Sequence, residues 1–322
     1  MRIHIQNDPA DTDFLITPAQ WQTAAAEEPP HEVSFGETPA DFDPVRATVE
    51  VLVGPPRSLR PLRPLAAPRL RLIFSNAAGV DGLAPFDWLP PGVTLLNNRG
   101  THGPKAGEYV AMAALLLAAR LPALMAAQQA GEWRRLPAPP LAGRRALVIG
   151  TGDLGSAGAR HLRALGVRTT GLNTSGTAHP DFDAVLPVAA LDDALPAADL
   201  LVLACPLTPA TRGLMDARRL GLLAAKAAVV NIGRGALIDN DALCDMLDAE
   251  RLAGAVLDVF PVEPLPHGHR IWRTRNLIAT PHQSCDDPVA YNARALAILA
   301  ANLRALRAGA PLPNRVDTER GY

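Results

Sequence analysis

Apolar residues in the first hundred positions follow the two-residue period of β-strands. The strands that this pattern predicts cover residues 3–5, 32–35, 49–53, 70–74 and 93–96. Thr17, Pro18 and Gln20 predict a helix start, since threonine caps the helix, proline is tolerated at its first position and glutamine closes a capping box. Strands that alternate with helices or turns are typical of a small parallel α/β domain.

The rest of the chain alternates between helical and strand patterns. A long helix is predicted at 104–117, and because it is apolar on most faces we expect it to be buried or to lie in an interface. The other predicted helices cover residues 154–165, 217–224 and 240–250, and the strands cover 167–172, 200–204, 228–232, 253–258 and 276–279. This order predicts a doubly wound parallel sheet. A final helix at 288–306 has no obvious place in that sheet, so we expect the chain to return there to the first domain.

A glycine turn joins the apolar run 145–149 to the helix predicted at 154–165. Its sequence is Gly150-x-Gly152-x-x-Gly155, in the strand–turn–helix context that a dinucleotide-binding fingerprint requires. Gly150 allows a tight turn, Gly152 lets a pyrophosphate approach the backbone, and Gly155 lets helix and strand pack closely. The helix N-terminus adds unpaired N–H groups for the anion. The alternative is an ordinary turn of an α/β sheet.

Composition narrows the class of protein. A chain of 322 residues with 48% apolar residues and a net charge of −1 predicts two globular domains and no nucleic-acid partner. The longest apolar run, 109–119, is shorter than the roughly 20 residues that span a bilayer, so we expect no membrane association. The first residues lack the apolar core of a signal peptide. Three cysteines without CxxC spacing favour a reducing compartment, and we therefore expect a cytoplasmic protein.

Three polar residues follow predicted strands of the second sheet. Arg234 stands between glycines and offers a planar fork of donors that suits a carboxylate. Glu263 lies in the loop after 253–258, and His282 follows the last strand. Separately, each has a simpler interpretation: a surface turn, a solvated loop charge and a structural histidine. Together, beside a dinucleotide turn, they predict an active site. His267 and His269 lack further ligands at metal-binding spacing, so we expect no metal site.

At this point the chain resembles the D-2-hydroxyacid dehydrogenase family, and within it the glyoxylate/hydroxypyruvate reductases. Beside the glycine turn, the matching motifs are Cys205-Pro206-Leu207-Thr208-Pro209, Asn231-Ile232-Gly233-Arg234-Gly235, Leu257-Asp258-Val259-Phe260 with Glu263-Pro264, and Thr280-Pro281-His282. Weaker matches lie at Ala78-Gly79-Val80-Asp81 and Asn98-Arg99-Gly100. The resemblance covers most of the chain from about residue 70.

The resemblance implies two similar α/β domains of the Rossmann-like or flavodoxin-like type, each with a doubly wound parallel sheet. An NAD(P)-binding domain at 99–281 would be inserted into a substrate domain made of 1–98 and 282–322. It also implies a homodimer supported by the helix at 104–117. The implied activity is hydride transfer between NAD(P)H and a small 2-keto or 2-hydroxy acid.

The resemblance also implies roles for single residues. Arg234 would bind the substrate carboxylate, His282 would be the acid/base, and Glu263 would hydrogen-bond His282. The backbone at Ala78 and Gly79 would also bind the carboxylate. The implied cofactor contacts are Gly150, Gly152, Asp153, Leu154, Gly155, Asn173, Thr174, Ser175, Cys205, Pro206, Thr211, Ile232, Gly233, Arg234, Asp258 and His282, with Asp258 on the nicotinamide carboxamide.

Two questions stay open in the sequence. The second nucleotide strand ends in Asn173, where an NAD-preferring site usually carries an acid. Without that charge, and with Thr174 and Ser175 as donors, we lean slightly to NADP(H) over NAD(H). The second question is whether the chain is an enzyme at all. A non-enzymatic NAD(H)-sensing protein like the family's corepressors is the alternative, because those proteins keep the same three site residues.

Overall fold

The computed structural model describes residues 1–322, which divide into two compact units. Unit 1 comprises residues 1–102 and 287–322, and unit 2 comprises residues 103–286. These boundaries lie a few residues C-terminal to the predicted ones at 98/99 and 281/282. As a consequence, His282 belongs to unit 2 and not to the start of the predicted substrate segment.

Unit 1 is a five-stranded parallel sheet in the order β2-β1-β3-β4-β5, the flavodoxin-like order. Its strands are β1 (Arg2–Gln6), β2 (Glu32–Gly36), β3 (Val51–Gly54), β4 (Leu72–Ser75) and β5 (Thr94–Leu96). Its helices are α1 (Pro18–Ala24), α2 (Pro56–Leu59) and α9 (Tyr291–Ala308). The capping box at the start of α1 is confirmed, because Gln20 N donates to Thr17 Oγ1 and Thr17 N donates to Gln20 Oε1.

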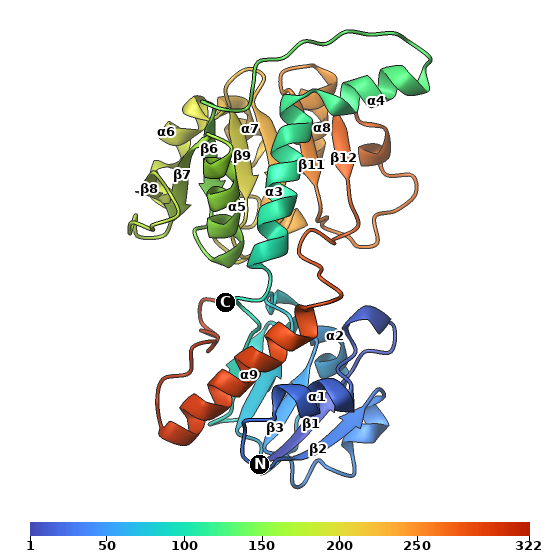
Figure 1. Cartoon of the computed structure of the whole chain (residues 1–322), viewed down its shortest axis with the longest axis vertical. Helices are drawn as coiled ribbons and strands as arrows, with labels where there is room; N and C mark the ends of the chain where they lie inside the picture. The colour runs from blue at the N-terminus through green and yellow to red at the C-terminus, as the bar shows by residue number, and fades with distance from the viewer. The chain divides into compact units, whose positions relative to one another are not determined.

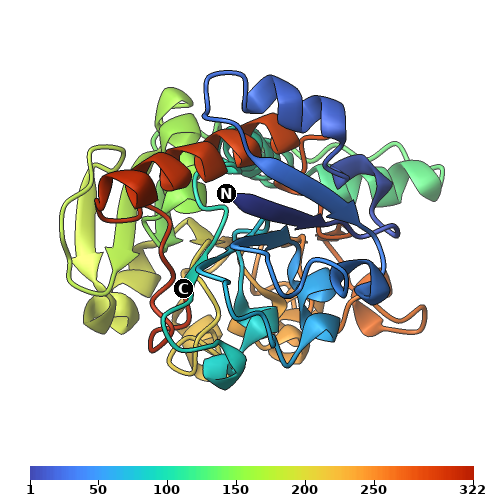
Figure 2. The same cartoon turned by 90° about the horizontal axis from the view of Figure 1, so that it is seen from below.

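Helices α1 and α9 lie over one face of this sheet (Figure 2). Leu296, Leu299 and Leu303 of α9 form one buried cluster with apolar residues of the strands, among them Ile5 and Val53. The three leucines recur at helical spacing, so one stripe of α9 faces the sheet. The last helix therefore completes the core of unit 1.

Unit 2 is a seven-stranded parallel sheet in the order β12-β11-β10-β9-β6-β7-β8 (Figure 1). Its strands are β6 (Arg145–Ile149), β7 (Arg168–Asn173), β8 (Ala184–Pro187), β9 (Leu200–Leu203), β10 (Ala228–Asn231), β11 (Gly254–Leu257) and β12 (Leu277–Ala279). Its helices are α3 (Gly103–Ala118), α4 (Leu121–Gln129), α5 (Asp153–Ala164), α6 (Leu191–Ala194), α7 (Ala217–Leu222) and α8 (Asn240–Asp248). After β6 the chain adds β7 and β8 on one side of it, and it then crosses over to add β9 to β12 on the other side. Rossmann folds bind their ligand at this crossover point, between β6 and β9.

Both faces of the larger sheet are covered. Leu147 and Ile149 belong to one buried cluster and Val148 to another, since successive side chains of a strand point to opposite faces. On the second face α3 packs tightly against α5. A Cβ at Gly107 would overlap the ring of His161, so this approach depends on glycine.

Strand β8 and helices α4 and α6 were not predicted, and one helix begins later than expected. Strand β8 is a short, half-exposed edge strand without clear alternation. Helix α4 follows a left-handed residue, Arg120 (φ 57°), which separates it from α3. Helix α9 begins at Tyr291 and not at residue 288.

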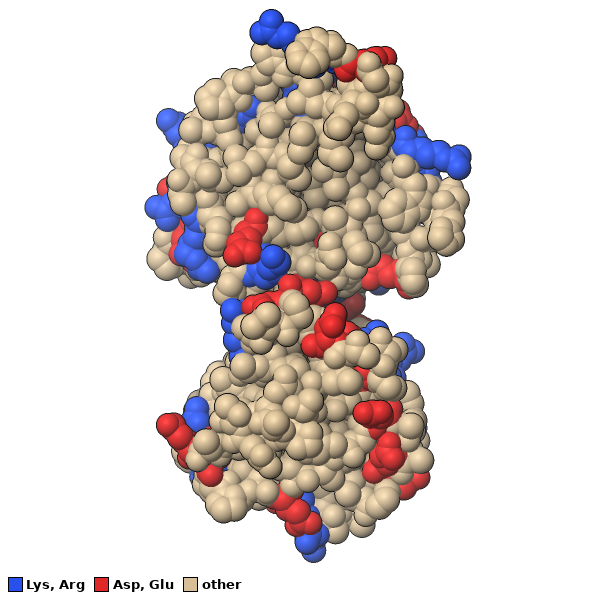
Figure 3. Space-filling view, turned by 45° about the vertical axis from the view of Figure 1, so that its right-hand side comes forward, with Lys and Arg blue, Asp and Glu red and all other residues tan.

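No single helix is long and apolar enough to cross a membrane. Helices α3 and α4, bent by 64° at their junction, pass that test only as a pair and only by length and composition. More than half of the residues of α3 are buried within the protein. Acidic and basic side chains are interspersed on the face drawn in Figure 3, which carries no broad basic surface.

Candidate active site

The glycine turn after β6 has the shape that a diphosphate group needs. Gly150 has a φ of 101°, and a Cβ there would lie 2.8 Å from Ala204 O. A Cβ at Gly155 would overlap Gly150 O, so α5 reaches this turn only because position 155 has no side chain. A Cβ at Gly152 would meet nothing within 4 Å, which leaves open space beside the backbone. These residues fit a dinucleotide bound through its phosphates.

Helix α5 begins at Asp153, directly after this turn. Gly152 is the N-cap and supplies no side-chain cap, and the first helical bond runs from Ser156 N to Gly152 O (2.9 Å). The N–H groups of the first turn therefore point out of the helix, toward a ligand or water. Asp153 and Leu154, both predicted contacts, lie half-buried in this turn.

Asn173 ends β7, and its side chain forms hydrogen bonds within the chain. The amide nitrogen donates to Thr151 Oγ1 (3.1 Å) and to Thr177 O (2.9 Å), and the amide oxygen accepts from Gly176 N (2.6 Å). These bonds close the loop after β7 and tie it to the glycine turn. Asn173 therefore fixes the shape of this loop, a role that its sequence position alone did not indicate.

The hydroxyl groups of the same loop face solvent. Thr174 and Ser175 are exposed, and Ser175 Oγ lies 2.6 Å from Thr177 Oγ1. The loop from Asn173 to Thr177 contains no acidic and no basic residue. It can donate hydrogen bonds to a ribose or a phosphate, and it repels neither.

The loops after β9 and β10 line the same sheet edge. Cys205 is buried, and burial raises the pKa of its thiol to about 12, so it packs as a neutral group. Thr211 Oγ1 donates to Pro206 O (2.7 Å) and so shapes the first loop. Ile232 is buried, and a Cβ at Gly233 would lie 2.9 Å from Cys205 O, which brings the two loops into contact.

Arg234 follows β10 on a backbone that Asn231 holds. The Asn231 side chain is fully buried, accepts from Gly233 N (3.0 Å) and donates to Arg234 O (3.0 Å). The half-buried Arg234 donates from Nη1 to Gly233 O (2.7 Å). The sequence analysis gave Asn231 no role of its own, although a polar residue at the end of a buried strand is itself a signal.

Glu263 and His282 form the central contact of the site. Nδ1 of His282 lies 2.7 Å from Glu263 Oε2, and Glu263 Oε1 accepts from Phe260 N (2.8 Å). The imidazole keeps 48% of its surface exposed and the carboxylate 35%. With Nδ1–H donated to the carboxylate, Nε2 is the ring atom available to a substrate.

The pair favours an ionised state. The hydrogen bond to Glu263 raises the pKa of His282 and outweighs partial burial and the nearby Arg234 guanidinium. Partial burial disfavours the Glu263 carboxylate, but its hydrogen bonds to His282 and to Phe260 N outweigh burial and lower the pKa of Glu263. The pair thus favours the protonated form of an imidazole that solvent and ligand can reach.

Asp258 follows β11 and is fully buried. Its carboxylate accepts from Thr280 Oγ1 (2.6 Å), Gln283 N (3.0 Å) and Ser284 N (2.8 Å). Three of its hydrogen bonds thus hold the segment that carries His282. Its predicted contact with the nicotinamide carboxamide stays a prediction.

Ala78 and Gly79 lie in unit 1, in the loop after β4. Ala78 O accepts from Asn97 Nδ2 (3.1 Å), which fixes the loop. The N–H groups of Ala78 and Gly79 donate no hydrogen bond within the chain. They are therefore available to an anion, and their predicted contact with the substrate carboxylate stays a prediction.

Comparison with known proteins identifies the chain. The sequence profile described as "D-isomer specific 2-hydroxyacid dehydrogenase, NAD binding domain" matches residues 111–284, more than half of the chain. The chain belongs to the D-isomer specific 2-hydroxyacid dehydrogenase family. It is an NAD(P)-dependent oxidoreductase of 2-keto and 2-hydroxy acids, and the non-enzymatic alternative is not favoured.

Individual relatives agree with this assignment. Glyoxylate/hydroxypyruvate reductase A of Serratia proteamaculans is 32% identical over 79% of this chain and 82% of its own. Glyoxylate reductase of Thermococcus kodakarensis is 29% identical over 79% and 78%. The crystal structure of NADPH-dependent glyoxylate/hydroxypyruvate reductase from Sinorhizobium meliloti, in complex with NADP and sulfate, is 29% identical. It covers 100% of this chain and 99% of its own, with a TM-score of 0.83.

The fold brings most of the predicted site residues of this dehydrogenase to one sheet edge. Arg234, Glu263 and His282 follow β10, β11 and β12, which are adjacent strands, and the glycine turn follows β6 in the same sheet. Ala78 and Gly79 alone lie in the other unit. The side chains of Asn231 and Thr280, which hold these loops, and that of Tyr109 on α3 were not predicted to have individual roles.

The glycine turn can be tested by two alanine variants with opposite outcomes. Gly155→Ala should destabilise unit 2 by about 2 kcal/mol, because overpacking a tight contact costs about 1–3 kcal/mol. Gly152→Ala should fold like the wild type but bind the dinucleotide about tenfold more weakly, because its methyl group fills the open space. Thermal unfolding and cofactor titration measure the two effects. Unchanged cofactor binding in Gly152→Ala would remove this turn from the cofactor site.

The Glu263–His282 pair can be tested without turnover. Glu263→Gln should lower the pKa of His282, because the imidazolium loses its charged partner. NMR titration of the imidazole, assigned with His282→Ala, measures this change. Glu250→Gln serves as the control, since Glu250 precedes β11 whereas Glu263 follows it. An equal pKa of His282 in the wild type, Glu263→Gln and Glu250→Gln would mean that Glu263 does not stabilise the imidazolium.

Proposed function

We propose that this dehydrogenase reduces a small 2-keto acid of the glyoxylate or hydroxypyruvate type. The observation that carries the proposal is the 2.7 Å contact between His282 and Glu263, with Arg234 on the adjacent strand end. The named relatives that reduce glyoxylate or hydroxypyruvate support this substrate class. A reduced nicotinamide dinucleotide, whose diphosphate the glycine turn would hold, would supply the hydride.

In this proposal His282 is the acid/base. Reduction of a ketone places negative charge on its oxygen, and a proton from His282 Nε2 neutralises that charge. Glu263 keeps the imidazole charged beforehand and orients it through Nδ1. In the reverse direction the neutral imidazole accepts the hydroxyl proton, while Glu263 stabilises the imidazolium that forms.

Arg234 binds the substrate carboxylate. Its planar guanidinium, which donates from Nη1 to the adjacent Gly233 carbonyl, presents a fork of N–H groups that matches the two oxygens of a planar carboxylate. This binding fixes the carbonyl of a 2-keto acid at a set distance from the arginine.

For the cofactor we propose NADP(H), with NAD(H) close behind. The loop after β7 carries no acid that would repel a 2′-phosphate, and Thr174, Ser175 and Thr177 present hydroxyl donors there. A dehydrogenase of the same family from Xanthobacter autotrophicus, 29% identical with a TM-score of 0.83, was crystallised with NADPH. The loop from Asn173 to Thr177 has no arginine to bind a 2′-phosphate, so we expect the preference for NADP(H) to be small.

We further propose a homodimer formed through α3, α4 and the segment up to residue 140. Four of the nine large exposed apolar residues of the chain lie in this stretch: Met112, Leu115, Met125 and Trp133. Ala127 is the one buried residue of α4, so this helix packs poorly on its own unit. A second copy would cover these side chains.

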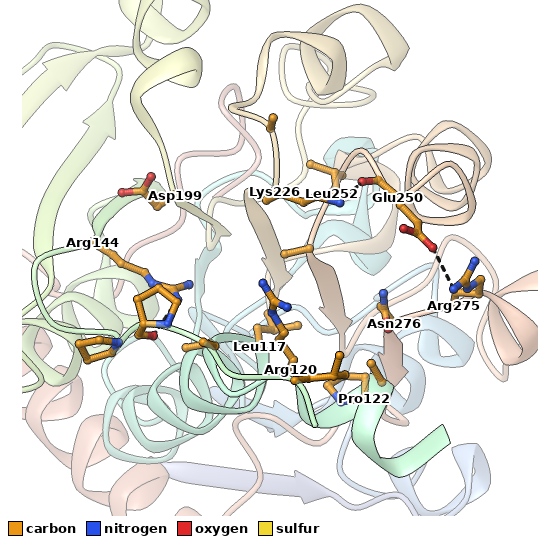
Figure 4. Close-up of a pocket in the computed structure, with 18 of the residues that line it drawn as sticks. Leu117, Arg120, Pro122, Arg144, Asp199, Lys226, Glu250, Leu252, Arg275 and Asn276 are labelled. Carbon is orange, nitrogen blue, oxygen red and sulfur yellow. Dashed lines mark hydrogen bonds and ion pairs between the residues drawn. The ribbon is translucent and has the colours of Figure 1, made fainter. Parts of the chain in front are cut away.

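An open groove of about 740 Å³ lies beside this segment (Figure 4). Side chains of both signs line it, among them Arg120, Arg144 and Lys226 with Asp199 and Glu250. A surface that carries both signs can be complementary to a second copy of itself. The groove lies beside the amino ends of the strands, at the sheet edge opposite the active-site loops, so a partner seated there leaves the active site open.

We place the protein in the cytoplasm. Cys205, Cys244 and Cys285 are all free thiols, and two of them are buried. Such a set is stable in a reducing compartment.

Arg234→Lys tests the carboxylate contact. We expect kcat/KM to fall by about 100-fold or more, because a point charge cannot replace a bidentate donor. The dissociation constant of the cofactor should stay unchanged. Arg251→Lys, an exposed arginine, is the control. Activity close to the wild type in Arg234→Lys would exclude Arg234 from substrate binding.

Thr174→Asp tests the cofactor preference better than a change at Asn173, whose side chain holds the loop. An added carboxylate should lower kcat/KM for NADPH about tenfold relative to NADH, since like charges repel. Thr174→Asn is the uncharged control. If the ratio of kcat/KM for NADPH to that for NADH does not change, Thr174 does not face the 2′-position of the cofactor's ribose.

Leu115→Glu tests the dimer. Light scattering should give a dimer for the wild type and a monomer for this variant, because a charge would be buried in an apolar interface. Val289→Glu is the control, since Val289 is a 92% exposed apolar residue in unit 1. A monomeric wild type at micromolar concentration would contradict the proposal.

A further inference from the structure

His282 has a backbone conformation that a histidine does not adopt freely. Its φ is 53°, in the left-handed region, where a non-glycine residue is strained. Its N–H donates to Asp258 O (2.8 Å) and contacts Thr280 O (3.0 Å). Surrounding contacts must therefore hold the segment from 280 to 284 in place.

The side chain of Asp258 makes most of the hydrogen bonds that fix this segment. Three donors from this segment converge on its carboxylate: the hydroxyl of Thr280 and the backbone N–H groups of Gln283 and Ser284. They bracket His282 on both sides. Because Asp258 is fully buried, water cannot replace a donor that is lost.

The Thr280 bond continues to helix α3. Tyr109 OH lies 2.5 Å from Thr280 Oγ1, across 171 positions of sequence. Thr280 has one hydroxyl proton, which it donates to Asp258, so Tyr109 must be the donor to Thr280. Burial raises the pKa of Tyr109 to about 12, which keeps this donor protonated. Tyr109, Thr280 and Asp258 thus form one directed chain of hydrogen bonds, defined here as the 109–280–258 chain.

We propose that Tyr109 and Thr280 are positioning residues for His282, which they place at hydrogen-bonding distance from Glu263. The 109–280–258 chain ends at the Asp258 carboxylate, which binds residues on both sides of the strained His282. It begins at Tyr109, which lies in the long, largely buried helix α3. This proposal rests on the proposed acid/base role of His282.

The proposal predicts a change in the imidazole itself. If the segment relaxes, the bond between His282 and Glu263 lengthens, and the pKa of His282 falls. The charged groups around the imidazole are Glu263, Arg234 and Asp258, and because Thr280 and Tyr109 are neutral, replacing either residue removes no charged side chain from this set. A shift in that pKa therefore reports position and not a change in charge.

The experiment compares Thr280→Val, Thr280→Ser and Tyr109→Phe with the wild type. Thr280→Val keeps the shape and removes the hydroxyl, whereas Thr280→Ser retains the hydroxyl. Tyr322→Phe, at the exposed C-terminus, controls for the tyrosine change. For each protein we would measure kcat and KM for keto-acid reduction, cofactor dissociation, thermal stability and the pKa of His282 by NMR.

We expect Thr280→Val to lower kcat about tenfold or more with little change in cofactor binding, and to lower the pKa of His282. Thr280→Ser should keep both kcat and the pKa of His282 close to their wild-type values. Tyr109→Phe should also lower kcat and the pKa of His282, but by less. The double variant should behave like Thr280→Val alone, because both changes break the same chain of hydrogen bonds. Should Thr280→Val fail to fold, Tyr109→Phe and the serine variant carry the test.

A loss of thermal stability with kcat and the pKa of His282 unchanged would overturn the proposal, since the chain would then support the fold alone. Full effects in the serine variant would also overturn it, because the hydroxyl would not be the active feature. Wild-type activity of His282→Ala would instead reject the proposed acid/base role. The pKa measurement would still show whether the chain positions the imidazole.

Discussion

In the proposed mechanism, the chemistry of this dehydrogenase depends on the hydrogen bond between His282 and Glu263. It joins loops that follow β11 and β12, and it forms because parallel strands deliver their carboxyl ends to one edge of the sheet. The same edge carries Arg234 after β10 and the glycine turn after β6. The proposed proton donor, carboxylate-binding group and phosphate-binding turn therefore come together although they lie far apart in the sequence.

Buried polar side chains at the strand ends make this arrangement rigid. Asn231 and Asp258 are fully buried, and each satisfies backbone N–H or C=O groups of the loop that carries a site residue. Asn173 does the same for the cofactor loop. Losing such a group leaves a buried partner unsatisfied, which costs about 1–3 kcal/mol. The site residues are thus positioned by neighbours that never need to touch the substrate.

Much of the fold followed from local sequence patterns. The strands of both sheets, the capping box at Thr17 and the glycine turn could be predicted, because burial, capping and tight turns depend on neighbouring residues. Strand β8 and helix α4 could not, since one is a half-exposed edge strand and the other packs poorly on its own unit. Arg234, Glu263 and His282 predicted an active site only when the three were considered together. The contact between Tyr109 and Thr280 spans 171 positions, and no local pattern contains it.

The most direct test of the account is the pH dependence of the wild-type reaction in both directions. Keto-acid reduction requires protonated His282, so its rate should fall as pH rises through the pKa of the imidazole, which Glu263 holds above the ordinary value of 6.5. Oxidation of the hydroxy acid requires the neutral imidazole, so its rate should rise through the same pKa. Two opposite limbs that share one pKa above 6.5, and that vanish in His282→Ala, are the predicted result. Limbs of the same sign, or pH profiles that persist without His282, would contradict the central role of the Glu263–His282 pair.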